Sequence, residues 1–320
     1  MSKLASQHRT DFPISIFYAY KAEEGRDGRE SGWSTFLQAM VDAGLQITAT
    51  WPIRTERQAR SNALAANALA SSVVLTCRPR GENSAVVNRA EFVSTLRSRL
   101  PEALGLLLQS NIAPVDLPQA SIGPGMKIFS GFAGVVQADG QNMKASAALA
   151  LINQYLDEFF SGVEVELDAD SRFAYDWYRQ YGFESGPSGN ADSIAQARGT
   201  SLDGINASAI GSAVAGKFRL TRLSQSGAAW NPDQDARPTV WEAVHHLAGK
   251  LEVSEMEAGQ LYARLGSLRE GVRDLAYMLY RAANERGDAA AARSYNGLVL
   301  ALPVIIERSR EAILEQSDLI

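Results

Sequence analysis

The chain is poor in the residues that build metal and redox sites. Its 320 residues include one cysteine, Cys77, and three histidines, His8, His245 and His246. One cysteine excludes an internal disulfide framework and a thiolate metal cluster, and Cys77 lies in an apolar run typical of a strand core. The two adjacent histidines would point about 100° apart on a helix. We predict no metal site and a reducing, cytoplasmic setting.

Long apolar runs are also missing. No stretch reaches the roughly 18 to 20 apolar residues that cross a bilayer. The first residues, MSKLASQHRT, lack the apolar core of a signal peptide. With 46% hydrophobic and 21% charged residues, the composition is typical of a soluble globular protein. We therefore expect no membrane partner, and a chain long enough for two or more cores of ordinary size.

Charge is distributed unevenly along the chain, whose net charge is −5. Residues 1–100 carry 13 Lys and Arg against 9 Asp and Glu, a net charge of +4. The remaining 220 residues carry 18 against 27, a net charge of −9. An acidic chain gains no general attraction to nucleic acid. If the protein contacts DNA, the basic N-terminal part is the better candidate, with ordinary solvated charge as the alternative.

The first eighty residues have the pattern of an α/β sheet. ISIFYAY (14–20), LQITATW (45–51) and SSVVLTC (71–77) are rich in β-branched and aromatic residues and predict three strands. SGWSTFLQAMVDAG (31–44) has the apolar spacing of a helix. Strand, helix and strand predict a parallel pair with a right-handed crossover, and the third strand is expected antiparallel to the second. Because the first strand is apolar like a central one, the sheet behaves as if earlier strands were missing.

This arrangement is similar to the end of a known fold. A helix and a strand followed by an antiparallel last strand end the class I methyltransferases, which use S-adenosyl-L-methionine. FYAYK, GWSTFLQAMVDAGLQITATWPIRTE and NALASSVVLTCRPR resemble the adenine-specific DNA methylases, large enzymes with an N-terminal domain of unknown function. The similarity continues through NIAPVDLPQASIGPGMKIFS, LALINQYLDE, WYRQYGFESGP and VWEAVHHL, over nearly the whole chain. The resemblance covers only the C-terminal part of such enzymes, whose donor-binding and catalytic motifs lie upstream of residue 12 here.

Neither essential motif occurs elsewhere in the chain. Methylation of adenine needs a Pro-Pro-aromatic motif that holds the flipped base, and WNPD (230–233) has one proline and an acid in place of the aromatic residue. The donor needs a glycine-rich turn after a strand, and the glycines of FSGFAG (129–134) are three residues apart, where two are needed. We expect no catalytic residue and no cofactor bound by this chain alone. S-adenosyl-L-methionine would bind the complete enzyme, with an N-terminal methyltransferase piece or subunit as partner.

About twenty residues separate the second and third strands. They contain Arg54, Arg57 and Arg60, which would line one side of a helical turn. These arginines, and Lys21 after the first strand, follow carboxyl ends of strands, where open α/β sheets bind ligands. We predict that the four residues contact DNA phosphates and position the DNA without reading its sequence. The alternative is a solvated loop with a local Arg54–Glu56 ion pair.

From about residue 86 the apolar spacing becomes helical. NRAEFVSTLRSRL and PEALGLLLQS predict two helices, with Pro101 opening the second. GPG at 123–125 predicts a break, and GFESGPSGN (182–190) predicts a linker. The last ninety residues predict a helical bundle.

Residues 191–223 have the outline of a winged helix-turn-helix. Two short helices meet at Gly199, and GKFRLTRL follows as a hairpin arm. The second helix, TSLDGINASAI, contains no Lys or Arg, although recognition helices need donors for bases and phosphates. Lys217, Arg219 and Arg222 of the wing are better placed to contact DNA. A module for packing or protein contact is the alternative.

The expected fold class is α/β followed by mainly α, a C-terminal fragment of a class I methyltransferase (Rossmann-like) sheet and then a large helical region with a winged helix. The expected domains are a partial methyltransferase domain (1–82), a helical domain (83–185), a winged helix-turn-helix (186–225) and a C-terminal bundle (226–320). The expected function is the C-terminal portion of an adenine-N6 DNA methyltransferase of restriction-modification or phage defence. The alternative is a non-catalytic adaptor that binds DNA or protein through the winged-helix segment.

Overall fold

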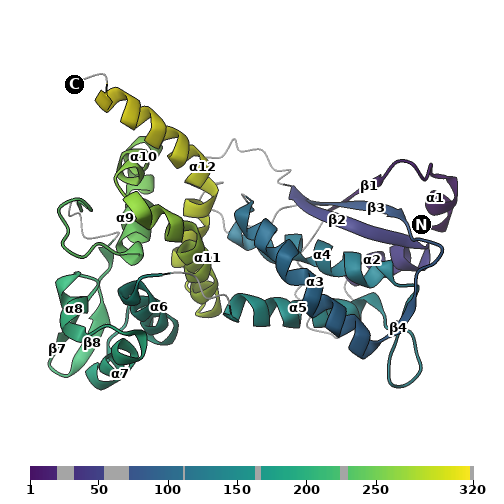
Figure 1. Cartoon of the computed structure of the whole chain (residues 1–320), viewed down its shortest axis with the longest axis horizontal. Helices are drawn as coiled ribbons and strands as arrows, with labels where there is room; N and C mark the ends of the chain where they lie inside the picture. The colour runs from purple at the N-terminus through teal and green to yellow at the C-terminus, as the bar shows by residue number, and fades with distance from the viewer. Residues whose placement is uncertain (20–31, 54–71, 111, 163–166, 224–229, 318–320) are drawn as a thin grey trace. The chain divides into compact units, whose positions relative to one another are not determined.

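The computed structural model describes residues 1–19, 32–53, 72–110, 112–162, 167–223 and 230–317 (Figure 1). These residues are mainly helical, with small sheets. They form two compact units, one built from the described residues up to 162 and the other from 167 onward.

The first unit contains a three-stranded sheet, a short parallel strand pair and five α-helices among its described residues. In chain order these are α1 (Ser2–Gln7), β1 (Ile14–Ala19), α2 (Gly32–Asp42), β2 (Leu45–Ile53), β3 (Ser72–Pro79), β4 (Val86–Asn88), α3 (Arg89–Gln109), the 3₁₀ helix η1 (Pro114–Asp116), α4 (Leu117–Gly131), β5 (Gly134–Val136) and α5 (Ala145–Gly162).

The three predicted strands form one sheet in the order β1-β3-β2. β3 is antiparallel to both neighbours, so its predicted direction relative to β2 is confirmed. β1 and β2 run parallel to each other but are not adjacent, so the prediction of a directly paired parallel couple is wrong. A helix is about 10 Å wide, which is about two strand spacings, so the crossover through α2 leaves room for one strand between them.

One face of this sheet packs on the helices of the first unit (Figure 1). Leu45 and Ile47 of β2 and Leu75 of β3 point into this core and are fully buried. Phe92 of α3 and Met126 of α4 belong to the same core. The boundary expected after residue 82 therefore does not divide two cores, because side chains on both sides of it belong to one core and one compact unit.

Helix α4 packs on β2 so closely that the backbone of Gly123 lies against the backbone of Thr50. The GPG motif lies inside α4 and does not break it, contrary to the prediction. A Cβ on Gly123 would lie 2.7 Å from the backbone nitrogen of Thr50, so glycine is needed for this approach. Pro124 has no N–H and leaves the carbonyl of Ala120 without its helical donor, and the Thr50 hydroxyl donates to that carbonyl at 3.3 Å. The motif thus serves helix–strand packing.

Pro101 also lies inside a helix. α3 runs unbroken from Arg89 to Gln109, where two helices were predicted. A capping box between Asn88 and Glu91 begins it. Leu96, Leu100 and Leu104 are buried on one continuous face across the proline. Burial of this face outweighs the loss of one helical hydrogen bond.

The second unit is a small α/β module followed by a helical bundle. Its elements are α6 (Ala169–Tyr181), β6 (Gly186–Pro187), α7 (Ser188–Arg198), α8 (Leu202–Ala207), β7 (Gly211–Val214), β8 (Lys217–Leu220), α9 (Val240–Val253), α10 (Glu255–Ala263), the 3₁₀ helix η3 (Gly266–Leu268), α11 (Arg269–Glu285) and α12 (Ala289–Ser317). The bundle of α9 to α12 agrees with the predicted helical end of the chain.

The segment 182–190 is packed structure and not the predicted linker. Gly186 begins β6, and a Cβ there would lie 2.8 Å from the ring of Trp177 in α6. Trp177 is fully buried and contacts Phe218 of β8 edge to face, with ring centroids 4.8 Å apart. α6 therefore belongs with the strands and helices that follow it, and the expected boundary at 185/186 falls inside one module.

Helix α12 is the most apolar long helix of the second unit. Among the described residues it alone is long and apolar enough to cross a membrane, with a mean hydropathy of 1.4 over its best window. Half of that window is buried inside the protein. This burial, against α10 and α11, fits a core helix of a soluble protein.

Candidate nucleic-acid interface

Four of the seven residues predicted to contact DNA lie outside the described residues. They are Lys21, Arg54, Arg57 and Arg60. The strands that precede them, β1 and β2, run parallel, so their carboxyl ends lie at the same end of the sheet. The placement of the four residues at this end of the sheet stays a prediction.

The other three predicted residues belong to the module of the second unit. β6, β8 and β7 form a three-stranded antiparallel sheet with β8 in the centre. Phe218 and Leu220 of β8 are buried, and Lys217 and Arg219 alternate with them on the exposed face. Lys217 lies opposite Val214 and Pro187, and Arg219 lies opposite Ser212. The centre of this face therefore presents two positive charges with no acidic residue opposite them in the sheet.

Arg222 is exposed and lies over an aromatic ring. Its guanidinium carbon lies 4.5 Å from the centroid of the Phe183 ring, a cation–π contact. The prediction grouped Arg222 with Lys217 and Arg219, but the structure places it on an aromatic side chain beyond the end of β8. Of the three wing residues, only Lys217 and Arg219 have the alternation that points both side chains to one open face.

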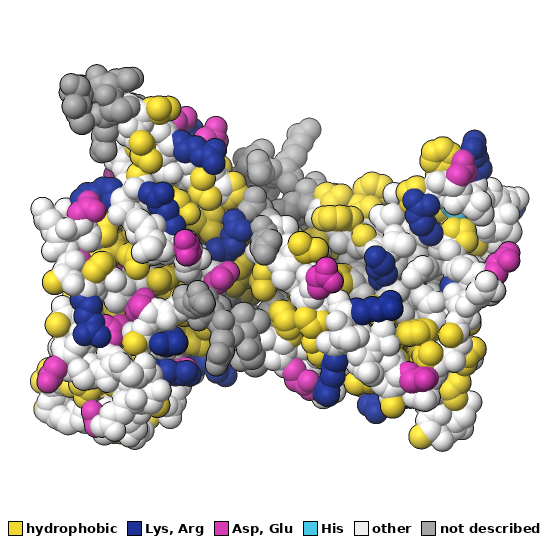
Figure 2. Space-filling model, in the orientation of Figure 1, with side chains coloured by type: hydrophobic (Ala, Val, Ile, Leu, Met, Phe, Trp, Pro, Cys, Tyr) yellow, Lys and Arg dark blue, Asp and Glu magenta, His cyan; other side chains and the backbone are white. Residues whose placement is uncertain are grey.

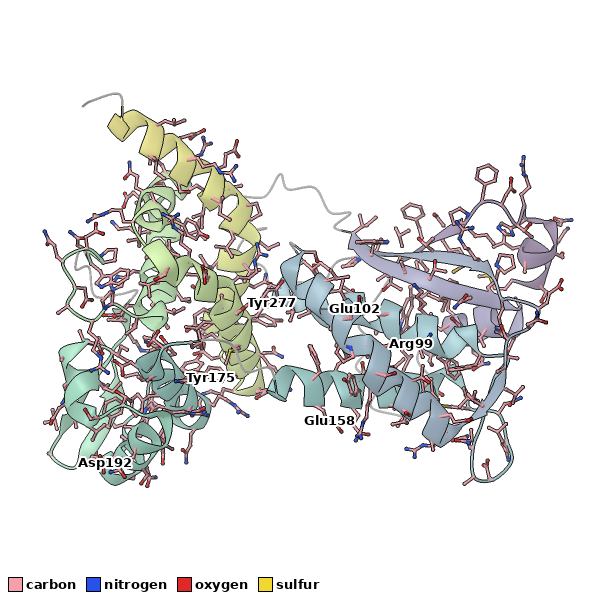
Figure 3. All side chains as sticks on the ribbon, viewed as in Figure 1. Arg99, Glu102, Glu158, Tyr175, Asp192 and Tyr277 are labelled. Atoms are coloured by element: carbon pink, nitrogen blue, oxygen red, sulfur yellow. The ribbon has the colours of Figure 1, made fainter. Side chains whose placement is uncertain are left out.

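Helix α8 lies where a recognition helix was expected, and its exposed charge is negative. Asp203 of α8 is exposed, and so is Asp192 of α7, labelled in Figure 3. Ser201 caps α8 by accepting from the N–H of Gly204. The helix has six residues and no positive side chain. Its surface is therefore poorly suited to phosphate or guanine acceptors.

An ion pair at Asp170 of α6 binds the segment that precedes α9. Nε of Arg237 lies 2.5 Å from Oδ2 of Asp170, and Nη2 donates to Oδ1 at 2.8 Å. The Asp170 side chain is 3% exposed. Thr200, which precedes α8, also donates to Asp170. The ion pair thus joins α6 to the segment before α9, and the Thr200 hydroxyl joins the start of α8 to the same carboxylate.

Asp168 caps two helices at once. Its Oδ1 accepts from the N–H of Ser171 in α6 at 2.8 Å, and its Oδ2 accepts from the N–H of Val240 in α9 at 3.0 Å. Ser171 Oγ donates to Oδ2 and accepts from the N–H of Trp241 at 2.8 Å. The first amides of α9 thus bind side chains of α6, which satisfies donors that helix geometry leaves open. The sequence did not predict these contacts between α6 and α9, because their only signal is an ordinary cap residue before α6.

The bundle also buries titratable groups of α9, among them the two adjacent histidines. His245 is buried; its Nδ1 is 2.8 Å from the carbonyl oxygen of Trp241 and its Nε2 is 3.0 Å from the Tyr295 hydroxyl. Burial lowers the pKa of His245 to about 4. His246 stacks on Trp230, and burial lowers its pKa to about 4 as well. Both rings are therefore neutral near pH 7 and serve packing.

Glu242 forms a buried capping box with Thr239 at the start of α9. The Thr239 hydroxyl lies 2.8 Å from its carboxyl oxygen, and burial raises the pKa of Glu242 to about 8. The folded state thus holds a proton that the unfolded chain releases above about pH 4.5. We expect the unfolding free energy to fall as pH rises from 6.5 to 8, by up to about 1.4 kcal/mol per pH unit from this group.

The measurement is urea unfolding of the wild type and of Glu242→Gln at pH 6.5, 7.2 and 8. Glutamine keeps the capping box but cannot ionise. The difference between wild type and variant should therefore shrink or change sign with rising pH. A difference that stays constant over this range would contradict the expectation.

The two segments that partly match catalytic motifs, WNPD and FSGFAG, have structural roles. In WNPD, Asn231 and Asp233 both accept hydrogen bonds from Arg264. In FSGFAG, Phe129 and Gly131 end α4 and Gly134 begins β5, so no glycine-rich turn follows a strand there.

Cys77 is buried in the sheet, and burial raises its thiol pKa to about 12, as expected for a core residue. Within the described ranges, no three His, Cys, Asp or Glu residues gather as metal ligands would.

The match to a known family covers the second unit. No curated protein and no solved structure matches the chain. The matched segment begins at Asp168, the residue that caps both α6 and α9, and includes both the α/β module and the bundle. Residues 168–319 match the model of a family described as a domain of unknown function (DUF8807).

Proposed function

We propose that this chain is the C-terminal portion of an S-adenosyl-L-methionine-dependent adenine-N6 DNA methyltransferase, of the adenine-specific DNA methylase family. The observation that carries the proposal is the sheet order β1-β3-β2 with β3 antiparallel. In the class I methyltransferase fold the last strand is antiparallel and lies between the two strands before it. The helix α2 that connects β1 and β2 has the place of the last crossover helix in that fold.

The chain contributes structure and DNA contacts, and a partner contributes the chemistry. The donor-binding turn and the base-holding motif are absent from the sequence, so a methyltransferase piece or subunit supplies both. S-adenosyl-L-methionine is the cofactor of the assembled enzyme. Such an enzyme acts on DNA in the cytoplasm, in restriction-modification or phage defence. The DNA is positioned at the end of the sheet that holds the carboxyl ends of β1 and β2, by Lys21, Arg54, Arg57 and Arg60.

We expect the reading frame upstream of this one to encode a polypeptide that carries an Asp-Pro-Pro-Tyr-like motif, and the test is co-expression of the chain with that polypeptide. We expect the complex to bind S-adenosyl-L-methionine in isothermal titration calorimetry with a micromolar dissociation constant, on the order of −8 kcal/mol. The chain alone should give no heat above dilution. Donor binding by the chain alone, or a complex that binds no donor, would refute the proposal.

A non-catalytic adaptor is the second candidate function. The observation that favours it is the element order α6-β6-α7-α8-β7-β8 with sheet order β6-β8-β7, which is the order of a winged helix. The exposed Asp203 of α8, which has no Lys or Arg, and the positive face of β8 suggest that such a module contacts DNA phosphates through its sheet and not through α8.

Charge reversal on β8 tests this DNA contact. We expect Lys217→Glu/Arg219→Glu to weaken binding of a 20-base-pair duplex about tenfold or more at low salt. The slope of log K against log salt should fall by roughly two units, since two phosphate contacts are lost. Fluorescence anisotropy measures both. Arg310→Glu, an exposed arginine on α12, is the matched control. Equal salt slopes for the two variants would exclude the β8 face as the contact.

A further inference from the structure

The two edges of the β1-β3-β2 sheet are finished differently. At β2 the protein covers its own edge with α4, since the N–H of Ile47 donates to Ser130 Oγ of α4 at 2.9 Å. The strand also has a register irregularity between Ile47 and Ala49, and Pro52 has no N–H to offer. Covering helices, bulges and prolines are devices that prevent further strand pairing. The β2 edge is therefore closed.

The β1 edge has none of these devices within the described ranges. All six residues of β1 pair with β3 in an unbroken register. The strand, ISIFYA, contains no proline and no charge. Among the described residues, no strand pairs with the side of β1 away from β3, and the backbone groups on that side can accept another strand.

The core is also less complete at β1 than at its neighbours. Ile14, Ile16 and Tyr18 point to the helical face but are only half-buried, whereas their counterparts on β3 are fully buried. Tyr18 contacts Trp33 and Phe36 of α2, with ring centroids 5.0 and 4.7 Å away. This aromatic group lies at the margin of the core, where another strand would extend the buried layer.

The opposite face of the sheet has an exposed apolar row. Phe17 of β1, Val74 of β3 and Trp51 of β2 lie opposite one another in the pairing register. We name these three residues the outer row. Phe17 is 71% exposed and Trp51 is 54% exposed. Figure 2 shows hydrophobic side chains gathered where these strands lie. A contiguous apolar patch of this kind marks an interaction surface.

We propose that the β1 edge and the outer row together form the docking surface for the polypeptide that carries the donor-binding half of the methyltransferase. This partner adds a strand parallel to β1 and lays a helix across the outer row. The parallel direction follows from the β1–α2–β2 unit, because sheets built from such crossovers continue with parallel strands covered by helices on both faces. The inference rests on the proposed function and specifies where its partner binds.

A second copy of the chain fits this surface less well. Two copies paired through β1 about a two-fold axis perpendicular to the sheet would have both outer rows on the same side. The two rows would then form one larger patch that remains exposed. A partner with a strand and a helix covers both the edge and the row, as folded α/β layers require.

The experiment measures assembly with the same upstream-encoded polypeptide. Ser15→Lys/Phe17→Lys places two charges on exposed positions of β1, so the chain itself should stay folded by circular dichroism. We expect its affinity for the partner, measured by biolayer interferometry, to fall about 100-fold or more, because two lysines would be buried in an apolar interface. Leu106→Lys, on α3 and 64% exposed, is the matched control and should leave the affinity unchanged.

The outcomes separate this inference from the proposed function. A complex that binds S-adenosyl-L-methionine but tolerates Ser15→Lys/Phe17→Lys overturns the docking surface and leaves the function standing. A complex that the variant abolishes, but that binds no donor, supports the surface and refutes the function. No complex at all refutes both. A homodimer of the chain alone that the variant dissolves assigns the surface to a second copy and overturns the proposal.

Discussion

Replacement of Asp168 by alanine should lower the unfolding free energy of the second unit by about 3 kcal/mol. The substitution removes the acceptor for the N–H groups that open α6 and α9 and for the hydroxyl of Ser171. A single cap is worth about 1 kcal/mol, and the buried N–H of Val240 left without a partner adds a further penalty of about 1 to 3 kcal/mol. The loss should therefore exceed that of an ordinary cap mutation.

Hydrogen exchange with mass spectrometry gives the measurement, since it reports α6 and α9 separately from the first unit. In Asp168→Ala we expect faster exchange in the first turns of both helices. Asp168→Asn is the control, because its amide oxygen still accepts one hydrogen bond and should retain part of the stability. If exchange rose in α6 alone, the shared cap would not be holding α9.

Replacement of Arg237 by alanine should cost about 2 kcal/mol, because it leaves the carboxylate of Asp170 without its cation. Breaking a fully buried pair typically costs more, about 3 to 5 kcal/mol. The Arg237 side chain is 47% exposed, so water can enter and solvate part of the charge left behind. The start of α8 should loosen at the same time, since Arg237 also donates to Thr200.

A double-mutant cycle separates the ion pair from the loss of Arg237 packing. Asp170→Ala/Arg237→Ala should be more stable than the sum of the two single losses predicts, by about 1 kcal/mol or more in urea unfolding. Additive losses would mean that the two side chains do not interact energetically.

The sequence predicted which segments form the strands and the helix of the sheet, but it did not predict which strands lie side by side. Three strands, the helix α2 and the antiparallel last strand follow from apolar patterns and from the handedness of crossovers. The place of β3 between β1 and β2 does not follow from these rules, because nothing in residues 72–79 distinguishes a central strand from an edge strand. Glycine and proline were also misread: Gly123, Pro124 and Pro101 act in tertiary packing, which local turn preferences do not describe.

The charged side chains show a similar limit. The alternation of Lys217 and Arg219 with buried Phe218 could be read from a hairpin pattern, and the structure has it. The partners of Asp168 and Asp170 could not, because they lie on segments distant in the sequence. The capping box of Thr239 and Glu242 is a local pattern, but the burial that raises the pKa of Glu242 is not. Arg222 has the same chemistry as its neighbours, and only its position over the ring of Phe183 sets it apart.

The covered edge at β2 limits how the enzyme that we propose could be engineered as a single chain. Additional strands can join only beyond β1, so a fused catalytic half must precede Ile14, with a linker that reaches the start of that strand. On the opposite margin, Ser130 of α4 already accepts the hydrogen of the Ile47 amide, so that amide is not available to a further strand.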